Sequence, residues 1–165
     1  MNIRRVALIF DNKLRPETTG SHCLRALGEL VEVVHFLPEQ CDQIPTDGFD
    51  LYLNIDDGLR YRLPPQLHPT VWWAIDTHLD PDWYRTKGPD FDAVFTAQRD
   101  GAESLRRAGL PRVEWLPLAC DPAIHRPHDV PVDFDVSFVG NLFPGPRGDL
   151  LALLQREFPA SFVGQ

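Results

Sequence analysis

Hydrophobic residues recur along the first 120 positions in short runs that polar segments separate. Val6 to Phe10 is an unbroken apolar run, typical of a parallel strand covered on both faces. Further runs of strand length lie at 31–37, 51–55, 70–75, 93–96 and 113–118. Apolar residues spaced as on one face of a helix lie between several of them, and helices are predicted at 22–30 and 99–108. This alternation predicts an α/β fold: a Rossmann-like parallel sheet with flanking helices.

The pattern changes after residue 121. Segment 122–133 holds three prolines and no apolar periodicity, which predicts a linker. A strand at 134–139, a helix at 149–157 and a strand at 161–164 follow. We therefore predict a first domain at 1–121, a Pro-rich linker at 122–133 and the β-α-β start of a second domain at 134–165. So short a segment has too little core to be independent, so we expect a truncated chain.

The charge of the chain limits its partners. Sixteen basic residues against twenty-four acidic ones give a net charge of −8, and the only lysines are Lys13 and Lys87. A face that neutralises many phosphates needs clustered cations, so nucleic acid is not an expected partner. No run approaches the ~20 apolar residues of a membrane span, and the N-terminus lacks the apolar stretch of a signal peptide. We expect a cytoplasmic protein without a transmembrane segment.

The three cysteines do not predict a metal centre. Cys23, Cys41 and Cys120 are widely spaced and form no Cys-x-x-Cys pair, so neither a zinc knuckle nor a disulfide framework is indicated. A site built from His22 and Cys23 with His35 or Cys41 is conceivable. Ordinary thiols in a reducing compartment explain the pattern better, and no metal or cofactor is expected.

Polar clusters follow most of the predicted strands. In an open parallel sheet, ligands bind outside the carboxyl ends of the strands, so these clusters predict a cleft without naming a reaction. Each cluster alone also fits ordinary loop chemistry, since acids and glycines end strands and cap helices. The clusters are Asp11–Asn12, Thr18–Gly20, Asp56–Asp57, Asp76–His78, Thr96–Gln98 and Cys120–Asp121.

The loop 140–148 is the most informative segment. Gly140 directly follows a predicted strand, and glycine there lets the backbone approach a ligand closely. Arg147 precedes the predicted helix, whose free N–H groups and dipole favour an anion. An arginine at such a position can bind a phosphate through two hydrogen bonds. The alternative is an ordinary helix start with a solvated arginine.

Residues 138–141 and 147–154 resemble the first strand, loop and helix of the donor domain in group 1 glycosyltransferases. Residues 115–122 resemble the crossover before that domain, and the likeness is greatest to the CgeB-like branch. Two positions depart from the group 1 pattern: Asn141 stands where many members carry arginine, and Arg147 where many carry lysine.

The resemblance implies a GT-B architecture, two Rossmann-like domains with the active site between them. It implies transfer of a sugar from a nucleotide-diphosphate donor to a hydroxyl of a carbohydrate, lipid or protein acceptor, with retention of configuration. The first domain would be the acceptor side. This chain alone is expected to be inactive, and its exposed segment 134–165 could pair copies into a homo-oligomer.

The resemblance also suggests site residues. His78 would contact the transferred sugar as a catalytic residue, and Asp76 would orient it or contact an acceptor hydroxyl. Gly20 is a candidate backbone donor to the sugar or its phosphate. Gly140, Asn141 and Arg147 would bind the donor phosphates. Each residue also has an ordinary structural interpretation, and His78 in particular could be a loop histidine near a helix start.

Three tryptophans, Trp72, Trp73 and Trp83, could form a wall on which a sugar stacks. Tryptophans in or beside a strand are more often part of the core.

Two other functions remain open. A receiver-like signalling domain also has an acid after its first strand and a phospho-accepting aspartate after its third. Asp11 and either Asp56 or Asp57 would fill these roles, but the lysine expected after the fifth strand is missing at 96–98. The chain could also be a non-catalytic binding module of the same fold.

Overall fold

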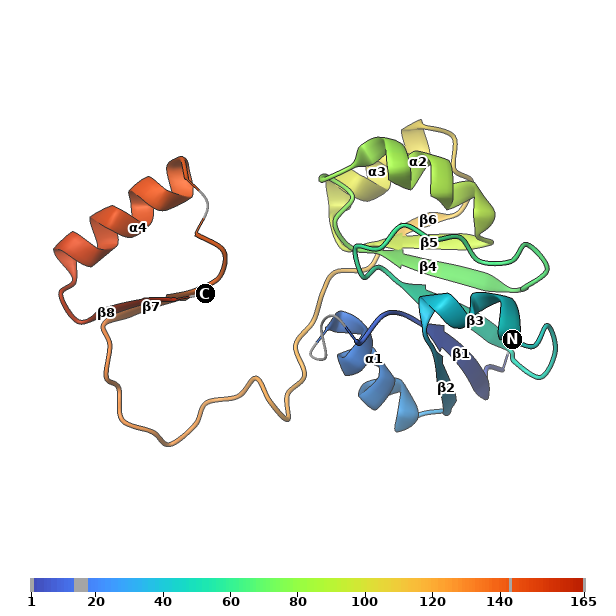
Figure 1. Ribbon diagram of the computed structural model, residues 1–165, viewed down its shortest axis with the longest axis horizontal. Helices are drawn as coiled ribbons and strands as arrows, with labels where there is room; N and C mark the ends of the chain where they lie inside the picture. The colour runs from blue at the N-terminus through green and yellow to red at the C-terminus, as the bar shows by residue number, and fades with distance from the viewer. Residues whose placement is uncertain (1, 14–17, 143, 165) are drawn as a thin grey trace. The chain divides into compact units, whose positions relative to one another are not determined.

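The computed structural model describes residues 2–13, 18–142 and 144–164, without the side chain of Phe162. The chain divides into two compact units, Met1–Ile124 and His125–Gln165 (Figure 1). None of the described helices is long and apolar enough to cross a membrane.

The first unit is built on a six-stranded sheet in the order β2-β1-β3-β4-β5-β6, and all neighbouring strands are parallel. The predicted α/β sheet with flanking helices is confirmed. The chain leaves β1 for β2 on one side and returns to β3 on the other, so the strand order switches between β1 and β3. The strands are β1 (Arg5–Ile9), β2 (Glu32–Phe36), β3 (Leu51–Ile55), β4 (Thr70–Ala74), β5 (Ala93–Thr96) and β6 (Val113–Trp115).

Strand β1 lies inside the sheet and is covered on both faces. Val6 is 2% exposed, and the next four residues, through Phe10, are fully buried. The prediction of a buried internal strand is confirmed. An unbroken apolar run is stable only where neither face meets water, which explains why polar residues appear only at its ends.

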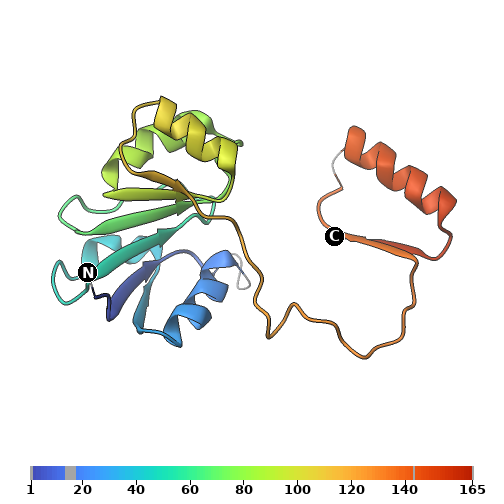
Figure 2. The same cartoon turned by 180° about the vertical axis from the view of Figure 1, so that it is seen from behind.

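Helices cover both faces of this sheet (Figure 2). Helix α1 (Thr19–Gly28) packs Leu24 and Leu27 over Leu8 and Phe10. Helices α2 (Pro81–Lys87) and α3 (Arg99–Arg107) cover the opposite face around Trp72. Two short 3-10 helices, η1 (Pro38–Gln43) and η2 (Gly88–Asp90), complete the unit.

Helix α1 begins at Thr19, three residues before the predicted start at His22. The hydroxyl of Thr18 accepts a hydrogen bond from the backbone N–H of Ser21 at 3.4 Å, and this cap starts the helix early. The apolar pattern marks only the buried stripe of a helix. The polar first turn of α1 therefore lay outside the predicted helix.

The second unit consists of β7 (Val136–Val139), α4 (Pro146–Glu157) and β8 (Ser161–Gly164), with β7 and β8 parallel. No helix or strand lies between β6 and β7. Helix α4 starts three residues before the predicted Asp149. Gly145, at φ +95°, makes the turn into the helix, and Pro146 is favoured in its first turn because the ring fixes a helical φ.

Candidate functional site

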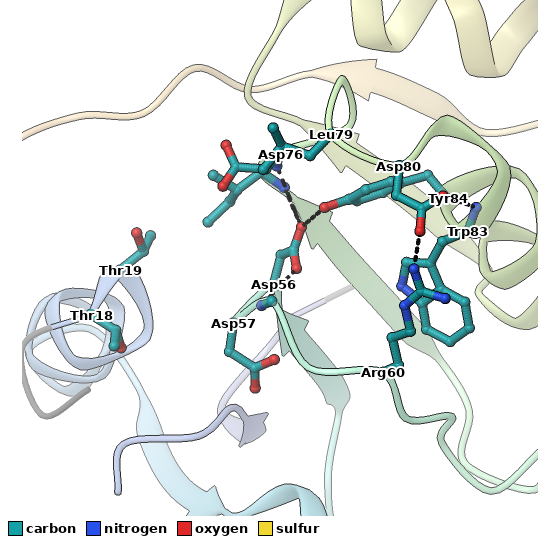
Figure 3. Close-up of a pocket in the computed structure, with 12 residues that line it drawn as sticks. Thr18, Thr19, Asp56, Asp57, Arg60, Asp76, Leu79, Asp80, Trp83 and Tyr84 are labelled. Carbon is teal, nitrogen blue, oxygen red and sulfur yellow. Dashed lines mark hydrogen bonds and ion pairs between the residues drawn. The ribbon is translucent and has the colours of Figure 1, made fainter. Parts of the chain in front are cut away.

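A cavity of about 390 Å³, called the cleft below, opens at the carboxyl ends of β3 and β4. Thr18 and Thr19, at the start of α1, line one side (Figure 3). Asp56 and Asp57, directly after β3, lie between that side and the residues of α2. The cleft therefore lies beside the switch in strand order between β1 and β3, the position at which open α/β sheets bind ligands.

Asp56 ties together the elements behind the cleft. Its Oδ2 accepts hydrogen bonds from the backbone N–H of Ile75 at 2.9 Å and from the hydroxyl of Tyr84. Its Oδ1 accepts from the N–H of Gly58 at 3.2 Å. Burial, together with the charge of Asp56, raises the pKa of Tyr84 far above its usual range, so Tyr84 remains a proton donor to this carboxylate. Asp56 thus holds the ends of β3 and β4 against α2.

Asp57 joins the end of β3 to the end of β1. Its Oδ2 accepts from the N–H of Asp11 at 2.8 Å and from the hydroxyl of Tyr61 at 3.2 Å. Its Oδ1 accepts from the N–H of Leu59 at 2.9 Å. Burial raises the pKa of Asp57, and these hydrogen bonds oppose the rise. Asp11 and Asp57, which the receiver pattern named, therefore lie close together, and both carboxylate oxygens of Asp57 accept hydrogen bonds.

The structure places Asp76 and His78 at different cavities. Asp76 lines the cleft with an exposed side chain, and in the described part of the chain its carboxylate accepts no hydrogen bond. His78 is also exposed, but it lines a separate cavity of about 150 Å³ beside Asp100 and Ser104 of α3. Thr77 between them is buried. Consecutive side chains after β4 thus point to different sides of the loop.

An arginine and a tryptophan form the α2 side of the cleft. Asp80 caps α2 by accepting a hydrogen bond from the N–H of Trp83 at 3.2 Å, and it also pairs with Arg60. The guanidinium of Arg60 lies 5.6 Å from the centre of the Trp83 ring. Sequence reasoning missed Arg60, because its loop has no periodicity. Asp80 directly precedes Pro81, the first residue of α2.

Only one of the three candidate tryptophans lines the cleft. Trp72 is fully buried and stacks on Tyr84 with ring centres 5.1 Å apart, so it belongs to the core. Trp73 is half-buried, and its indole N–H donates to the carbonyl of Leu116 at 3.0 Å. Trp83 alone contributes to the wall of the cleft, where a flat ring can stack on a sugar.

Gly20 lies in the first turn of α1, so the expectation of a loop position was wrong. It is buried, and a Cβ at this position would come within 2.2 Å of the ring of Phe10. The residue therefore has a clear packing role: it lets α1 lie directly on the end of β1.

The candidate phosphate loop belongs to the second unit. Arg147 lies in the first turn of α4, and its guanidinium donates to the carbonyl of Asn141 at 3.1 Å. Gly140 sits against Phe138, whose ring a Cβ would approach to 3.2 Å. The hydrogen bond closes the loop and holds the guanidinium at the helix N-terminus, where an anion is favoured.

The two candidate regions carry opposite charge. Among the described residues that line the cleft, four are carboxylates and Arg60 is the one cation, so this lining favours hydroxyl or amine donors over phosphates. Residues 140–147 carry only the positive charge of Arg147. Among the described residues, no group of three or more His, Cys, Asp or Glu side chains could hold a metal ion. The cleft acids are Asp56, Asp57, Asp76 and Asp80.

Comparison of the chain with protein-family models, with curated proteins and with solved structures found no match.

Proposed function

We propose that this chain is part of a GT-B glycosyltransferase that moves a sugar from a nucleotide-diphosphate donor to an acceptor hydroxyl. The observation that carries the proposal is the acidic, tryptophan-walled cleft at the switch in strand order. The resemblance of residues 138–154 to a donor domain supports it from the sequence. Residues 1–121 are then the acceptor side, and residues 134–165 begin the donor domain.

The chemistry of the cleft suits a carbohydrate-like acceptor. The carboxylate of Asp76 is exposed and can accept a hydrogen bond from an acceptor hydroxyl. Trp83 gives the cleft an aromatic wall that a sugar can contact, and the hydroxyls of Thr18 and Thr19 can donate or accept. The negative charge of the cleft disfavours the donor diphosphate, which therefore needs a different site.

The loop 140–147 supplies that second site. Arg147 pairs with the donor diphosphate, while the backbone N–H of Asn141 and the N-terminus of α4 contact it and Gly140 lets the backbone approach it closely. His78 acts on the transferred sugar from its own cavity after β4, and Asp76 acts on the acceptor. The nucleotide sugar is a substrate, so the reaction uses no further organic cofactor.

Donor binding tests the phosphate loop. Arg147→Ala removes a charge-assisted contact of about 2–3 kcal/mol, so donor affinity should fall roughly 30- to 150-fold. Titration calorimetry with a panel of nucleotide sugars, on the protein as its gene encodes it, measures this. Arg156→Ala is the matched control, because it removes the same charge at the other end of α4, where Arg156 pairs with Glu157.

The calorimetry has two contrary outcomes. Donor binding that Arg147→Ala leaves unchanged would remove the loop from the proposal. If the protein binds no nucleotide sugar, the glycosyltransferase proposal gives way to a non-catalytic binding module.

Turnover tests the first unit. His78→Ala and Asp76→Asn should lower turnover more than donor affinity, since both residues act on the reacting groups. Asp82→Asn is the control, because Asp82 is a nearby exposed acid that pairs with Arg85. Equal turnover in all three variants would show that neither residue acts in the reaction.

A receiver-like domain is the second candidate. The order of the first five strands, β2-β1-β3-β4-β5, is that of receivers, and Asp57 meets the end of β1. Three hydrogen bonds to Asp57 and the absence of lysine at 96–98 argue against phosphoryl transfer. Incubation with acetyl phosphate followed by mass spectrometry should detect no phosphoaspartate. A phosphorylated Asp57 would favour this candidate instead.

A further inference from the structure

A lysine is buried behind the cleft. Lys87, in the last turn of α2, is 2% exposed and is one of only two lysines in the chain. Its ammonium donates to the side-chain oxygen of Asn54 at 3.0 Å, and Asn54 is itself fully buried in β3. Buried lysines are rare, because removing an ammonium from water is costly unless other groups stabilise the charge. The surroundings of Lys87 therefore need an explanation.

Four aromatic rings surround this ammonium. Its distances to the ring centres are 4.5 Å for Trp72, 4.6 Å for Tyr61, 5.7 Å for Phe91 and 5.8 Å for Trp83. Each ring face attracts a cation, and the attraction is greatest where water is excluded. The aromatic cage thus stabilises a charge that lacks water.

Ionisable groups from several elements also act on Lys87. Asp56 and Asp57 lie after β3, Cys41 lies in η1, Asp90 lies in η2, and Tyr61 lies in the loop before β4. Burial lowers the pKa of Lys87 to about 8, and the charges of Asp56 and Asp57 limit the fall.

The hydrogen bonds run in one direction from Lys87 to the cleft. An ammonium can only donate, so the oxygen of the Asn54 side chain faces Lys87. The NH₂ group of Asn54 then donates to the hydroxyl oxygen of Tyr61 at 2.6 Å and to the carbonyl of Ile9 at 3.1 Å. The hydroxyl proton of Tyr61 is left to donate to Asp57 at 3.2 Å.

We infer that Lys87 is a positioning residue of the cleft. Acting through Asn54, its ammonium orients the hydroxyl proton of Tyr61 towards Asp57, and its charge serves as the counter-charge of that carboxylate. A lysine serving only to fill the core would need no polar chain to a cavity wall, and methionine would fill the same cage without a charge. The inference goes beyond the proposed function, because the coupling is a property of the folded unit whichever ligand the cleft takes.

The coupling is reciprocal and can be measured from both ends. The charge of Lys87 opposes the raised pKa of Asp57, and the charge of Asp57 opposes the lowered pKa of Lys87. Two interacting sites must shift one another's titration equally, so a change at either end appears at the other.

Nuclear magnetic resonance titration provides the test. With only two lysines, labelled lysine side chains give two ammonium signals, and the carboxyl carbon of Asp57 is followed in the same protein. Lys87→Met should raise the pKa of Asp57 further, while Lys13→Met should leave it unchanged. Lys13 is the matched control, because it is exposed and pairs with Glu39. Asp57→Asn should lower the pKa of Lys87.

Tyr61→Phe keeps the ring of the cage and removes only the hydroxyl, so it tests the chain even if Lys87→Met fails to fold. It should raise the pKa of Asp57, because the carboxylate loses a donor. The inference is overturned if Tyr61→Phe leaves the pKa of Asp57 unchanged and Asp57→Asn leaves that of Lys87 unchanged.

Discussion

The two units of this chain are built from the same kinds of element but bury very different amounts of apolar surface. In the first unit, three clusters of buried side chains fill both faces of the sheet. In the second, Leu151 is the only buried residue among those described, and Leu150 and Phe158 are 54% and 39% exposed. The two units differ in buried surface because helices cover both faces of the first sheet, whereas the second unit has a single helix.

Local signals are enough to define elements in both units. Gly145 and Pro146 mark the start of α4, and Thr18 caps the start of α1. A two-stranded sheet with one helix, however, has only one interface at which side chains can be buried. Six strands with helices on both faces enclose an interior. Stability should therefore be concentrated in the first unit.

Truncating one core residue in each unit tests this difference most strongly. Leu8→Ala, in fully buried β1, should destabilise the first unit by about 3 kcal/mol, through lost apolar contact and the cavity left behind. Leu151→Ala should leave that transition unchanged. Urea unfolding followed by tryptophan fluorescence reports selectively on the unfolding of the first unit, since every tryptophan lies there. The tryptophans are Trp72, Trp73, Trp83 and Trp115.

Equal losses in the two variants would contradict the comparison, because they would show that the units unfold as one.

The pH dependence of stability tests the buried charge of the first unit. The pKa of Lys87 falls from 10.5 to about 8 on folding. Between these values the unfolded chain binds more protons than the folded one, so the free energy of unfolding gains up to about 3 kcal/mol as pH rises. Lys87→Met should lack this gain, as urea unfolding between pH 7 and 10 would reveal.

Two thiols act in the opposite direction over part of this range. Burial raises the pKa of Cys23 and Cys41 to about 11, so the stability that they contribute is lost as pH rises above about 9. The difference between the wild type and Lys87→Met at each pH isolates the lysine. Parallel stability curves for the two proteins would show that folding does not lower the pKa of Lys87.

A pair of glycines in α1 provides the smallest test. Gly20→Ala should destabilise the first unit by about 1–3 kcal/mol, because the added methyl group meets the ring of Phe10. Gly28→Ala meets no atom within 4 Å and should stabilise the helix by about 0.5–1 kcal/mol. Thermal unfolding of the two variants should show shifts of opposite sign. A Gly20→Ala variant that is as stable as the wild type would mean that α1 does not rest on Phe10.

Several features of the fold could be predicted because they depend on neighbouring residues alone. The strands 51–55 and 93–96 have the predicted bounds, and β1 is buried as its apolar run indicated. The helix at 99 starts where it was predicted, but the starts of α1 and α4 were placed too late, since caps such as Thr18 lie outside the apolar pattern. For the cleft, the acids after β3 and β4 were recognised, but Arg60 was not, because its position depends on Trp83 and Asp80.

The sequence by itself determined the parallel α/β class and the presence of acids at strand ends, because strand burial and loop chemistry are written in adjacent residues. Only the tertiary structure decided that Asp76 and His78 line different cavities, that Trp72 is core while Trp83 lines the cleft, and that Lys87 is enclosed. Each outcome depends on which face of a strand or helix a side chain occupies and on what another segment places against it. Tyr61 and Asn54 surround Lys87 from positions 26 and 33 residues away, and only the folded sheet brings them together.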